Sequence, residues 1–128
     1  MALTGNTSTL MRDGKQFEYG VEANAAIYQG AVVQLNGNNV EKGAKAANKK
    51  YVGIALQQVT GSATDGEVKV NVRRRVAAKL KVASGRSLAL GATAYLEDDE
   101  TVHDQATGRS ALGDVVAVDT DGVWVWIE

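Results

Sequence analysis

The residues that most often carry enzyme chemistry are scarce in this chain. His103 is the single histidine and stands in a polar stretch rich in acidic residues, and there is no cysteine. No Ser–His–Asp spacing, HExxH or GxSxG motif occurs, and DGKQ at Asp13 lacks the upstream glycine and the hydroxyl residue of a phosphate-binding loop. A single histidine in a polar loop is usually an exposed surface residue without a catalytic role. The sequence therefore predicts a protein that is not an enzyme and uses no cofactor.

An acidic run at residues 97–100, EDDE, is the candidate for a metal site. Carboxylates are the ligands that Ca²⁺ prefers, but the run lacks the spacing and the glycine of an EF-hand loop. The simpler interpretation is a solvated hairpin tip, and we expect no metal site there.

The basic stretch EVKVNVRRRVAAKLKV, residues 67–82, raises the question of nucleic-acid binding. Its even-numbered positions are apolar except for Arg74, which predicts a strand with one buried face. Sixteen residues would span about 50 Å, longer than a usual strand, so the run must bend or break, and the triplet Arg73, Arg74 and Arg75 is the natural place. Arg74 points inward in this reading and must find a carboxylate or carbonyl groups.

The outward basic residues of this stretch define the alternative function. They are Lys69, Arg73, Arg75, Lys79 and Lys81. A small β-barrel that binds nucleic acid through the basic strand 69–81 would use them as phosphate contacts. No aromatic residue is interleaved for base stacking, and the pI is about 5.8, which argues against nucleic-acid binding. A solvated strand face and a protein–protein contact are the other readings.

The final strand, GVWVWIE, is apolar on both sides. It places Trp124 and Trp126 on one face and Val123, Val125 and Ile127 on the other. If the aliphatic face is core, the tryptophan pair is exposed, and exposed tryptophans are typical interface anchors. The reverse arrangement buries the tryptophans. Either way, a strand with two apolar faces predicts burial by another subunit or by the N-terminal arm. A carbohydrate platform made by the two indoles is a third function class.

Length and composition predict one folded domain. The chain has 128 residues, 45% apolar and 23% charged, and no apolar run long enough for a signal peptide or a membrane helix. We therefore expect a protein made in a cytoplasm, with no membrane partner. Residues 1–90 hold 13 Lys plus Arg against 6 Asp plus Glu, whereas residues 91–128 hold 1 against 9. This polarity favours head-to-tail self-contact or two partner surfaces, unless folding interleaves the halves.

An internal repeat organises the chain. GAVVQLN from Gly30 aligns with GATAYLE from Gly91, YVGIAL aligns with ALGDVV, and TDGEVKVNV from Thr64 aligns with TDGVWVWI. Period-2 alternation and Asp-Gly turns predict β structure in both copies, about 27–72 and 88–127. Residues 1–25 are expected to form an extended arm, and residues 26–128 a single all-β barrel or sandwich built from two similar units. Polar segments 36–50 and 97–110 are each expected as a loop or a mobile hairpin, with at most a loose turn of helix.

The second copy, GATAYLEDDETVHDQATGRSALGDVVAVDTDGVWVWIE, resembles the C-terminal half of small phage capsid decoration (cement) proteins, and the first copy resembles their N-terminal half. The resemblance covers residues 26–128 and rests on short glycine-centred motifs in a shared order. The stretch NVRRRVAAKLKV departs from it, because relatives tend to carry a less basic strand there.

The resemblance implies a β-rich structural protein on the outer capsid surface of the virion. Its expected partners are the major capsid protein and itself, as a homotrimer or alternatively a dimer. It is expected to bind an expanded head and clamp neighbouring capsid subunits. The residues expected at capsid or subunit interfaces are Leu3, Leu10, Met11, Phe17, Tyr19, Arg73, Arg74, Arg75, Trp124 and Trp126.

Overall fold

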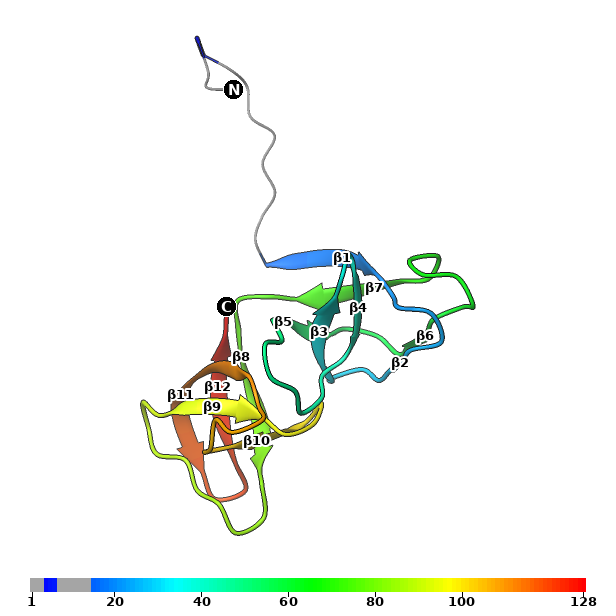
Figure 1. Ribbon diagram of the computed structural model, residues 1–128. Coiled ribbons are helices and arrows are strands. Elements are labelled where there is room, and N and C mark those ends of the chain that lie inside the picture. Colours follow the sequence, from blue (N-terminus) through cyan, green and yellow to red (C-terminus); the bar gives the residue numbers. More distant parts are fainter. Residues whose placement is uncertain (1–3, 7–14) are drawn as a thin grey trace.

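The computed structural model describes residues 4–6 and 15–128, which form an all-β protein of two lobes (Figure 1). We define lobe 1 as residues 15–75 and lobe 2 as residues 76–128. The strands of lobe 1 are β1 (Gln16–Gly20), β2 (Ala26–Ile27), β3 (Val32–Asn36), β4 (Asn39–Lys42), β5 (Tyr51–Ala55), β6 (Val59–Thr60) and β7 (Lys69–Arg73). Those of lobe 2 are β8 (Val76–Val82), β9 (Thr93–Leu96), β10 (Thr101–His103), β11 (Ala111–Asp119) and β12 (Gly122–Ile127).

Lobe 2 is a small closed barrel in the order β10-β8-β12-β11-β9. The period-2 alternation of β12 turns Val123, Val125 and Ile127 into the barrel, where each is at most 2% exposed. The barrel closes where β10 pairs in parallel with β8, at Val102 and Val82.

Lobe 1 has the same strand order, β1-β7-β5-β3-β4, with β2 and β6 forming a separate two-stranded sheet. Its two edge strands approach each other through a single parallel bridge between Val21 and Val40. These two valines lie 61 and 62 positions before Val82 and Val102, which close lobe 2. Each of the five main strands of lobe 1 therefore has a counterpart in lobe 2.

Two pairs of glycines show how closely the lobes correspond. Gly30 and Gly91 both adopt positive φ, 89° and 85°, at the turn before the third and the ninth strand. A Cβ atom at Gly53 would collide with the carbonyl oxygen of Arg73, and one at Gly113 with that of Trp126. Arg73 and Trp126 therefore occupy equivalent positions, and the segments 71–75 and 124–128 align residue by residue.

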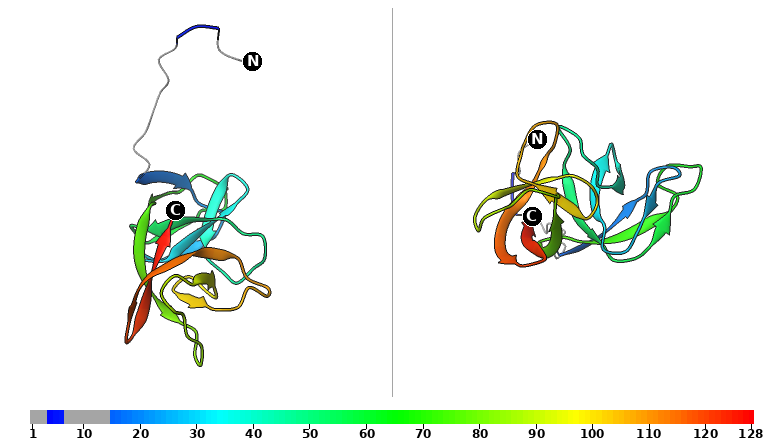
Figure 2. Two further views of the ribbon diagram at one scale, coloured as in Figure 1. Left: turned by 90° about the vertical axis from the view of Figure 1, so that its left-hand side faces the viewer. Right: turned by 90° about the horizontal axis from the view of Figure 1, so that it is seen from below.

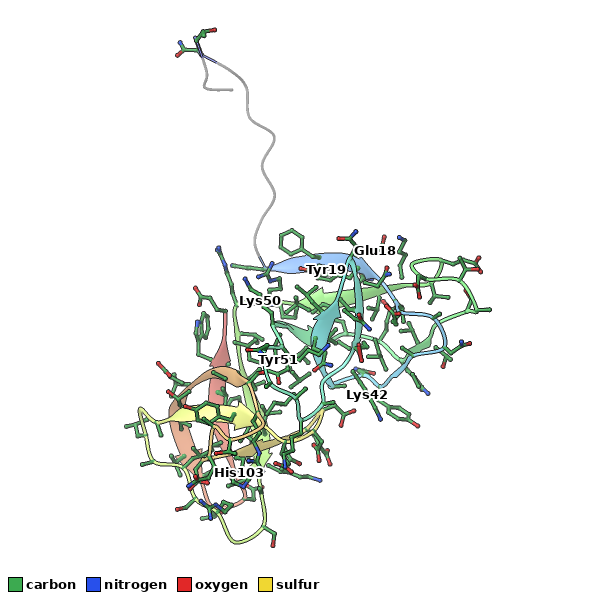
Figure 3. The ribbon with its side chains drawn as sticks, viewed as in Figure 1. Glu18, Tyr19, Lys42, Lys50, Tyr51 and His103 are labelled. Carbon is green, nitrogen blue, oxygen red and sulfur yellow. The ribbon has the colours of Figure 1, made fainter. Side chains whose placement is uncertain are left out.

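The lobes lie side by side and share part of a core (Figure 2). Val32 and Tyr51 belong to lobe 1 but pack into the apolar cluster of lobe 2, and Figure 3 shows Tyr51 between the two. Hydrogen bonds add to this contact: Val32 N donates to Asp99 O (2.9 Å), Lys49 N donates to Ser110 Oγ (2.9 Å), and Ser110 Oγ donates to Ala46 O (2.6 Å). The acidic turn 97–100 and the loop 43–50 thus join the lobes.

These observations confirm the all-β class and the internal repeat, and they correct its details. The predicted arm reaches too far, because β1 pairs with β7 and Val21 is fully buried. The repeat accordingly begins at β1 and β8, earlier than predicted. The predicted alignment of the third landmark is wrong by three residues, since Val70 rather than Glu67 corresponds to Val123. The two similar units predicted are the two lobes, and β4 and β10 lie in the polar segments expected as loops or hairpins.

Candidate functional site

The outward side of lobe 2 carries a patch of large apolar side chains, which we call the tryptophan face. It comprises Ala77, Lys79, Val116, Ala117, Trp124 and Trp126 on strands β8, β11 and β12. Trp124 is 36% exposed, Trp126 41% and Val116 49%. The alternate residues of β12 fill the barrel. This confirms the prediction in which the aliphatic residues form the core and the tryptophans are exposed.

Neighbouring carboxylates hold the indole rings of the tryptophan face in place. Trp124 Nε1 donates to Asp119 Oδ2 (2.9 Å), and Trp126 Nε1 donates to Glu128 Oε2 (2.7 Å). With their single donors satisfied, the rings offer electron-rich apolar faces, and each has a carboxylate at its N–H edge. Such rings lose little conformational entropy on binding, which suits an interface anchor.

The equivalent side of lobe 1 is polar, and we call it the arginine face. It comprises Gln16, Glu18, Leu56, Gln57, Asn71 and Arg73. Asn71 replaces Trp124 and Arg73 replaces Trp126. Gln57 Oε1 accepts hydrogen bonds from the backbone N (3.3 Å) and the Nδ2 (3.0 Å) of Asn71. The two lobes have the same pattern of core residues. Their outer faces therefore differ for reasons other than folding.

The basic stretch breaks at the arginine triplet, as predicted. The strand β7 ends at Arg73 in lobe 1, β8 begins at Val76 in lobe 2, and Arg75 between them adopts a φ of 50°. The basic residues that the sequence places on one outer face are therefore divided between two lobes.

Carboxylates neutralise the part of the stripe in lobe 2. Lys79 Nζ pairs with Asp121 (2.7 Å) and Asp119 (3.4 Å), and Lys81 Nζ pairs with Glu100 (3.2 Å). The hydrogen bond to Asp121 raises the pKa of Lys79 and lowers that of Asp121. Two of the five presumed phosphate contacts are thus occupied within the chain, which weakens the nucleic-acid alternative.

Arg74 occupies the position that the core residue Ile127 holds in lobe 2. The expectation that its guanidinium pairs with a carboxylate or a carbonyl group is wrong, because no described residue supplies one. Its guanidinium lies 5.6 Å from the ring centroid of Phe17, and Nη1 donates to Tyr19 Oη (3.3 Å). Its Nε is buried with no hydrogen-bond partner in the described part of the chain. Cation–π and hydrogen-bond contacts thus compensate the charge in part.

The structure separates the sequence-predicted interface residues into three groups. Phe17, Tyr19 and Arg74 cluster in lobe 1, where Tyr19 packs against the core, and Arg73 and Arg75 flank Arg74 at the end of β7. Trp124 and Trp126 lie on the tryptophan face of lobe 2. Leu3, Leu10 and Met11 lie outside the described residues. The predicted set is therefore not one surface.

The acidic run and the histidine have structural partners. Arg109 Nε donates to Glu97 Oε2 (2.6 Å), an interaction that lowers the pKa of this carboxyl, and Asp98 Oδ1 accepts from Glu100 N (2.9 Å). His103 lies on β10 rather than in a loop, and its Nδ1 accepts from Gln105 N (3.0 Å). Residues 4–6 and 15–128 contain no group of His, Cys, Asp or Glu suited to hold a metal ion and no helix long and apolar enough to cross a membrane.

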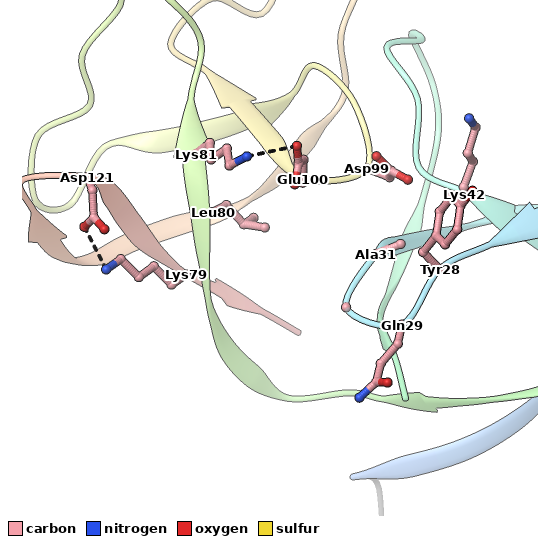
Figure 4. A pocket seen from close by; sticks show the side chains of 11 residues that line it. Tyr28, Gln29, Ala31, Lys42, Lys79, Leu80, Lys81, Asp99, Glu100 and Asp121 are labelled. Carbon is pink, nitrogen blue, oxygen red and sulfur yellow. Dashed lines mark hydrogen bonds and ion pairs between the residues drawn. The ribbon is translucent and has the colours of Figure 1, made fainter. Parts of the chain in front are cut away.

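A groove of about 770 Å³ runs between the lobes (Figure 4). Lys79 and Lys81, each paired with an acidic residue, line one wall. Tyr28 and Lys42 line the other wall. The charges of Lys79, Lys81, Glu100 and Asp121 are thus paired within lobe 2, whereas Asp99 and Lys42 form no ion pair among the described residues.

Sequence reasoning missed Val116, Asp114 and Leu90 near the tryptophan face. Gly91 N donates to Val115 O (2.9 Å), which places the 69%-exposed Leu90 beside β11. Asp114 lies on β11 next to the position of Trp126 and contacts Thr93 Oγ1 (3.4 Å). Strand alternation does not reveal them, because a β-bulge between Val115 and Ala117 shifts the pairing with β12.

Comparison with known proteins finds no family model that matches the chain and no matching curated protein.

Proposed function

We propose that this chain is a viral structural protein: a capsid decoration (cement) protein that binds the outer surface of an expanded phage head and clamps neighbouring major capsid proteins. The sequence resemblance over residues 26–128 suggests this class. The observation that carries the proposal is the tryptophan face, because it presents exposed aromatic rings whose orientation is fixed by hydrogen bonds. Aromatic residues of this kind concentrate binding energy in protein–protein contacts.

Two lobes with a shared core also suit a clamp. Val32 and Tyr51 fix lobe 1 against lobe 2, so a load applied to one lobe is transmitted to the other through packed side chains. A rigid body that contacts two subunits loses little entropy on its second contact.

Co-sedimentation with phage heads tests this function. Purified protein is mixed with expanded heads stripped of it, with unexpanded heads and with free DNA. Saturable binding to expanded heads alone is the expected result, and its stoichiometry separates three-fold from two-fold sites. Binding to free DNA alone would establish the nucleic-acid alternative instead, and binding to neither would reject both.

Two variants locate the attachment. Deleting residues 1–14 removes the N-terminal segment without entering β1, which begins at Gln16, and is expected to abolish head binding while leaving both lobes folded. Trp124→Ser with Trp126→Ser is expected to weaken binding at least about thirty-fold, the loss typical of removing an interface hot spot. Tyr28→Ser, a substitution of an exposed aromatic residue outside the tryptophan face, is the matched control. Unchanged binding by the double variant would remove this face from the attachment.

A further inference from the structure

The two lobes differ in charge at equivalent positions. Lobe 1, residues 15–75, holds 9 Lys plus Arg against 5 Asp plus Glu, whereas lobe 2, residues 76–128, holds 4 against 9. The same reversal occurs at the aligned surface positions: Arg75 corresponds to Glu128, and Glu18 corresponds to Lys79. Folding has therefore kept the charge polarity of the sequence and divided it between two lobes of one architecture.

The Trp126 end of the tryptophan face is aromatic and negative. Glu128 accepts the indole N–H, and Asp114 lies on the neighbouring strand β11, one residue before Val115, which pairs with Val125 of β12. Neither carboxylate forms an ion pair with any described residue, whereas Asp119 at the Trp124 end is paired with Lys79. An indole face flanked by unpaired carboxylates is a good receptor for a cationic side chain, through combined cation–π and charge interactions.

The arginine face of lobe 1 presents such a side chain. Arg73 is half-buried along its stem, its Nε donates to Arg74 O (3.3 Å), and it forms no ion pair among the described residues. Arg75 next to it is exposed and likewise forms none. Arginine is enriched in protein interfaces because its planar guanidinium stacks on aromatic rings and pairs with carboxylates at once.

We propose that the tryptophan face of one copy binds the arginine face of a second copy, with Arg73 of the second copy against Trp126 and Asp114 of the first. The inference rests on the proposed function in taking the tryptophan face as a protein-binding surface, and it identifies a copy of the same chain, rather than a capsid protein, as what covers it. The weaker head binding expected of the variant with both tryptophans replaced then follows from lost assembly. Glu18, the acidic residue of the arginine face, then meets a face whose basic residue is Lys79. Because the two surfaces are different, the contact is heterologous: copies join head to tail and form a closed ring or an open chain.

Mixing two variants tests this arrangement without capsids. Arg73→Glu damages the arginine face only, and Trp126→Ser damages the tryptophan face only. Each variant alone is expected to lose self-association by about thirty-fold or more, measured by analytical ultracentrifugation. An equimolar mixture still contains one intact face of each kind, so it is expected to form a heterodimer and nothing larger. Lys42→Glu makes the same charge change in the inter-lobe groove and is expected to assemble like the original chain.

Three outcomes would overturn the proposal. A monomeric original chain would show that the faces do not bind each other. Undiminished self-association of Arg73→Glu would indicate a symmetric contact between two tryptophan faces. A mixture that stays monomeric although both variants keep the β circular dichroism of the original chain would also contradict it. Assembly in solution without binding to heads would reject the proposed function alone, and binding of monomers to heads would reject this inference alone.

Discussion

Lobe 1 and lobe 2 have the same strand order and different surfaces. Glycines at equivalent positions make room for equivalent carbonyl groups, and valines at equivalent positions join the edge strands of each lobe. The outward positions diverge: the segment 71–75 reads Asn-Val-Arg-Arg-Arg where 124–128 reads Trp-Val-Trp-Ile-Glu. The shared glycines and valines are thus the residues that the fold requires. The outward residues that differ are the candidates for binding.

Glycine-to-alanine substitutions test whether the two lobes need the same close approach. Gly53→Ala and Gly113→Ala each drive a methyl group into a backbone carbonyl, which no rotamer change relieves. We expect each to lower the free energy of unfolding by about 3 kcal/mol or more, measured by urea denaturation. Gly85→Ala is the control, because a Cβ atom at Gly85 would meet open space. Only its positive φ of 75° disfavours alanine there, and we expect this to lower the free energy of unfolding by about 1 kcal/mol. A mild effect at either site would show that the lobes are not packed alike.

Exchanging core residues at one equivalent position sharpens the comparison. Ile127→Ala removes a 1%-exposed side chain and is expected to reduce the free energy of unfolding by about 3 kcal/mol. Arg74→Ile gives lobe 1 the residue of lobe 2 and eliminates the buried, unpartnered Nε. We expect thermal unfolding to show unchanged or slightly increased stability, by up to about 1 kcal/mol. A loss above about 1 kcal/mol would mean that the contacts of Arg74 with Phe17 and Tyr19 outweigh its desolvation.

Ser110→Ala tests how tightly the lobes are joined. The substitution removes both inter-lobe hydrogen bonds of the Ser110 hydroxyl and leaves Lys49 N and Ala46 O without this partner. We expect a loss of about 1–2 kcal/mol and broader thermal unfolding as the lobes become less coupled. Ser84→Ala, in the turn after β8, is the control and is expected to change neither.

Acidification is expected to affect the lobes in opposite directions. In lobe 2, hydrogen bonds from Arg109, Arg86 and Lys79 lower the pKa values of Glu97, Asp104 and Asp121. Their stabilising contribution is present above the unfolded pKa of about 4 and is lost as the pH falls through the lower folded values.

The carboxyl of Glu22 in lobe 1 shows the opposite shift. Desolvation is the larger cause that raises the pKa of Glu22, and the negative charge of the nearby Asp65 raises it further. Its contribution is present below the unfolded pKa and is lost as the pH rises through the folded value. Hydrogen exchange between about pH 6 and pH 3 should therefore show β12 amides losing protection relative to β7 amides, after correction for intrinsic rates. Equal loss in both lobes would contradict the assignment.

The all-β class and the repeat could be predicted from the sequence, because period-2 alternation and turn glycines are local signals. The same alternation left open which face of the last strand is exposed, since both faces are apolar. The break at the arginine triplet followed from strand length alone. The role of β1 was missed, because QFEYG pairs with β7, more than 45 residues away, and such pairing leaves no local pattern.

The surroundings of Trp126 could not be read from the sequence either. A β-bulge decides which residues of β11 lie beside β12, and the partner of Arg74 depends on where β1 lies. Both are consequences of tertiary packing rather than of propensity.

The connection between β5 and β7 in lobe 1 is longer than the equivalent connection between β11 and β12 in lobe 2, and this sets an order of folding. A two-residue turn, Thr120–Asp121, joins β11 to β12, whereas residues 56–68 separate β5 from β7. The shorter loop closes sooner and at less entropic expense, so we expect the β11–β12 hairpin to form first and lobe 2 to assemble around it. Val32 and Tyr51 then find a preformed apolar surface to dock on. The second half of the chain would in this way act as the template on which the first half folds.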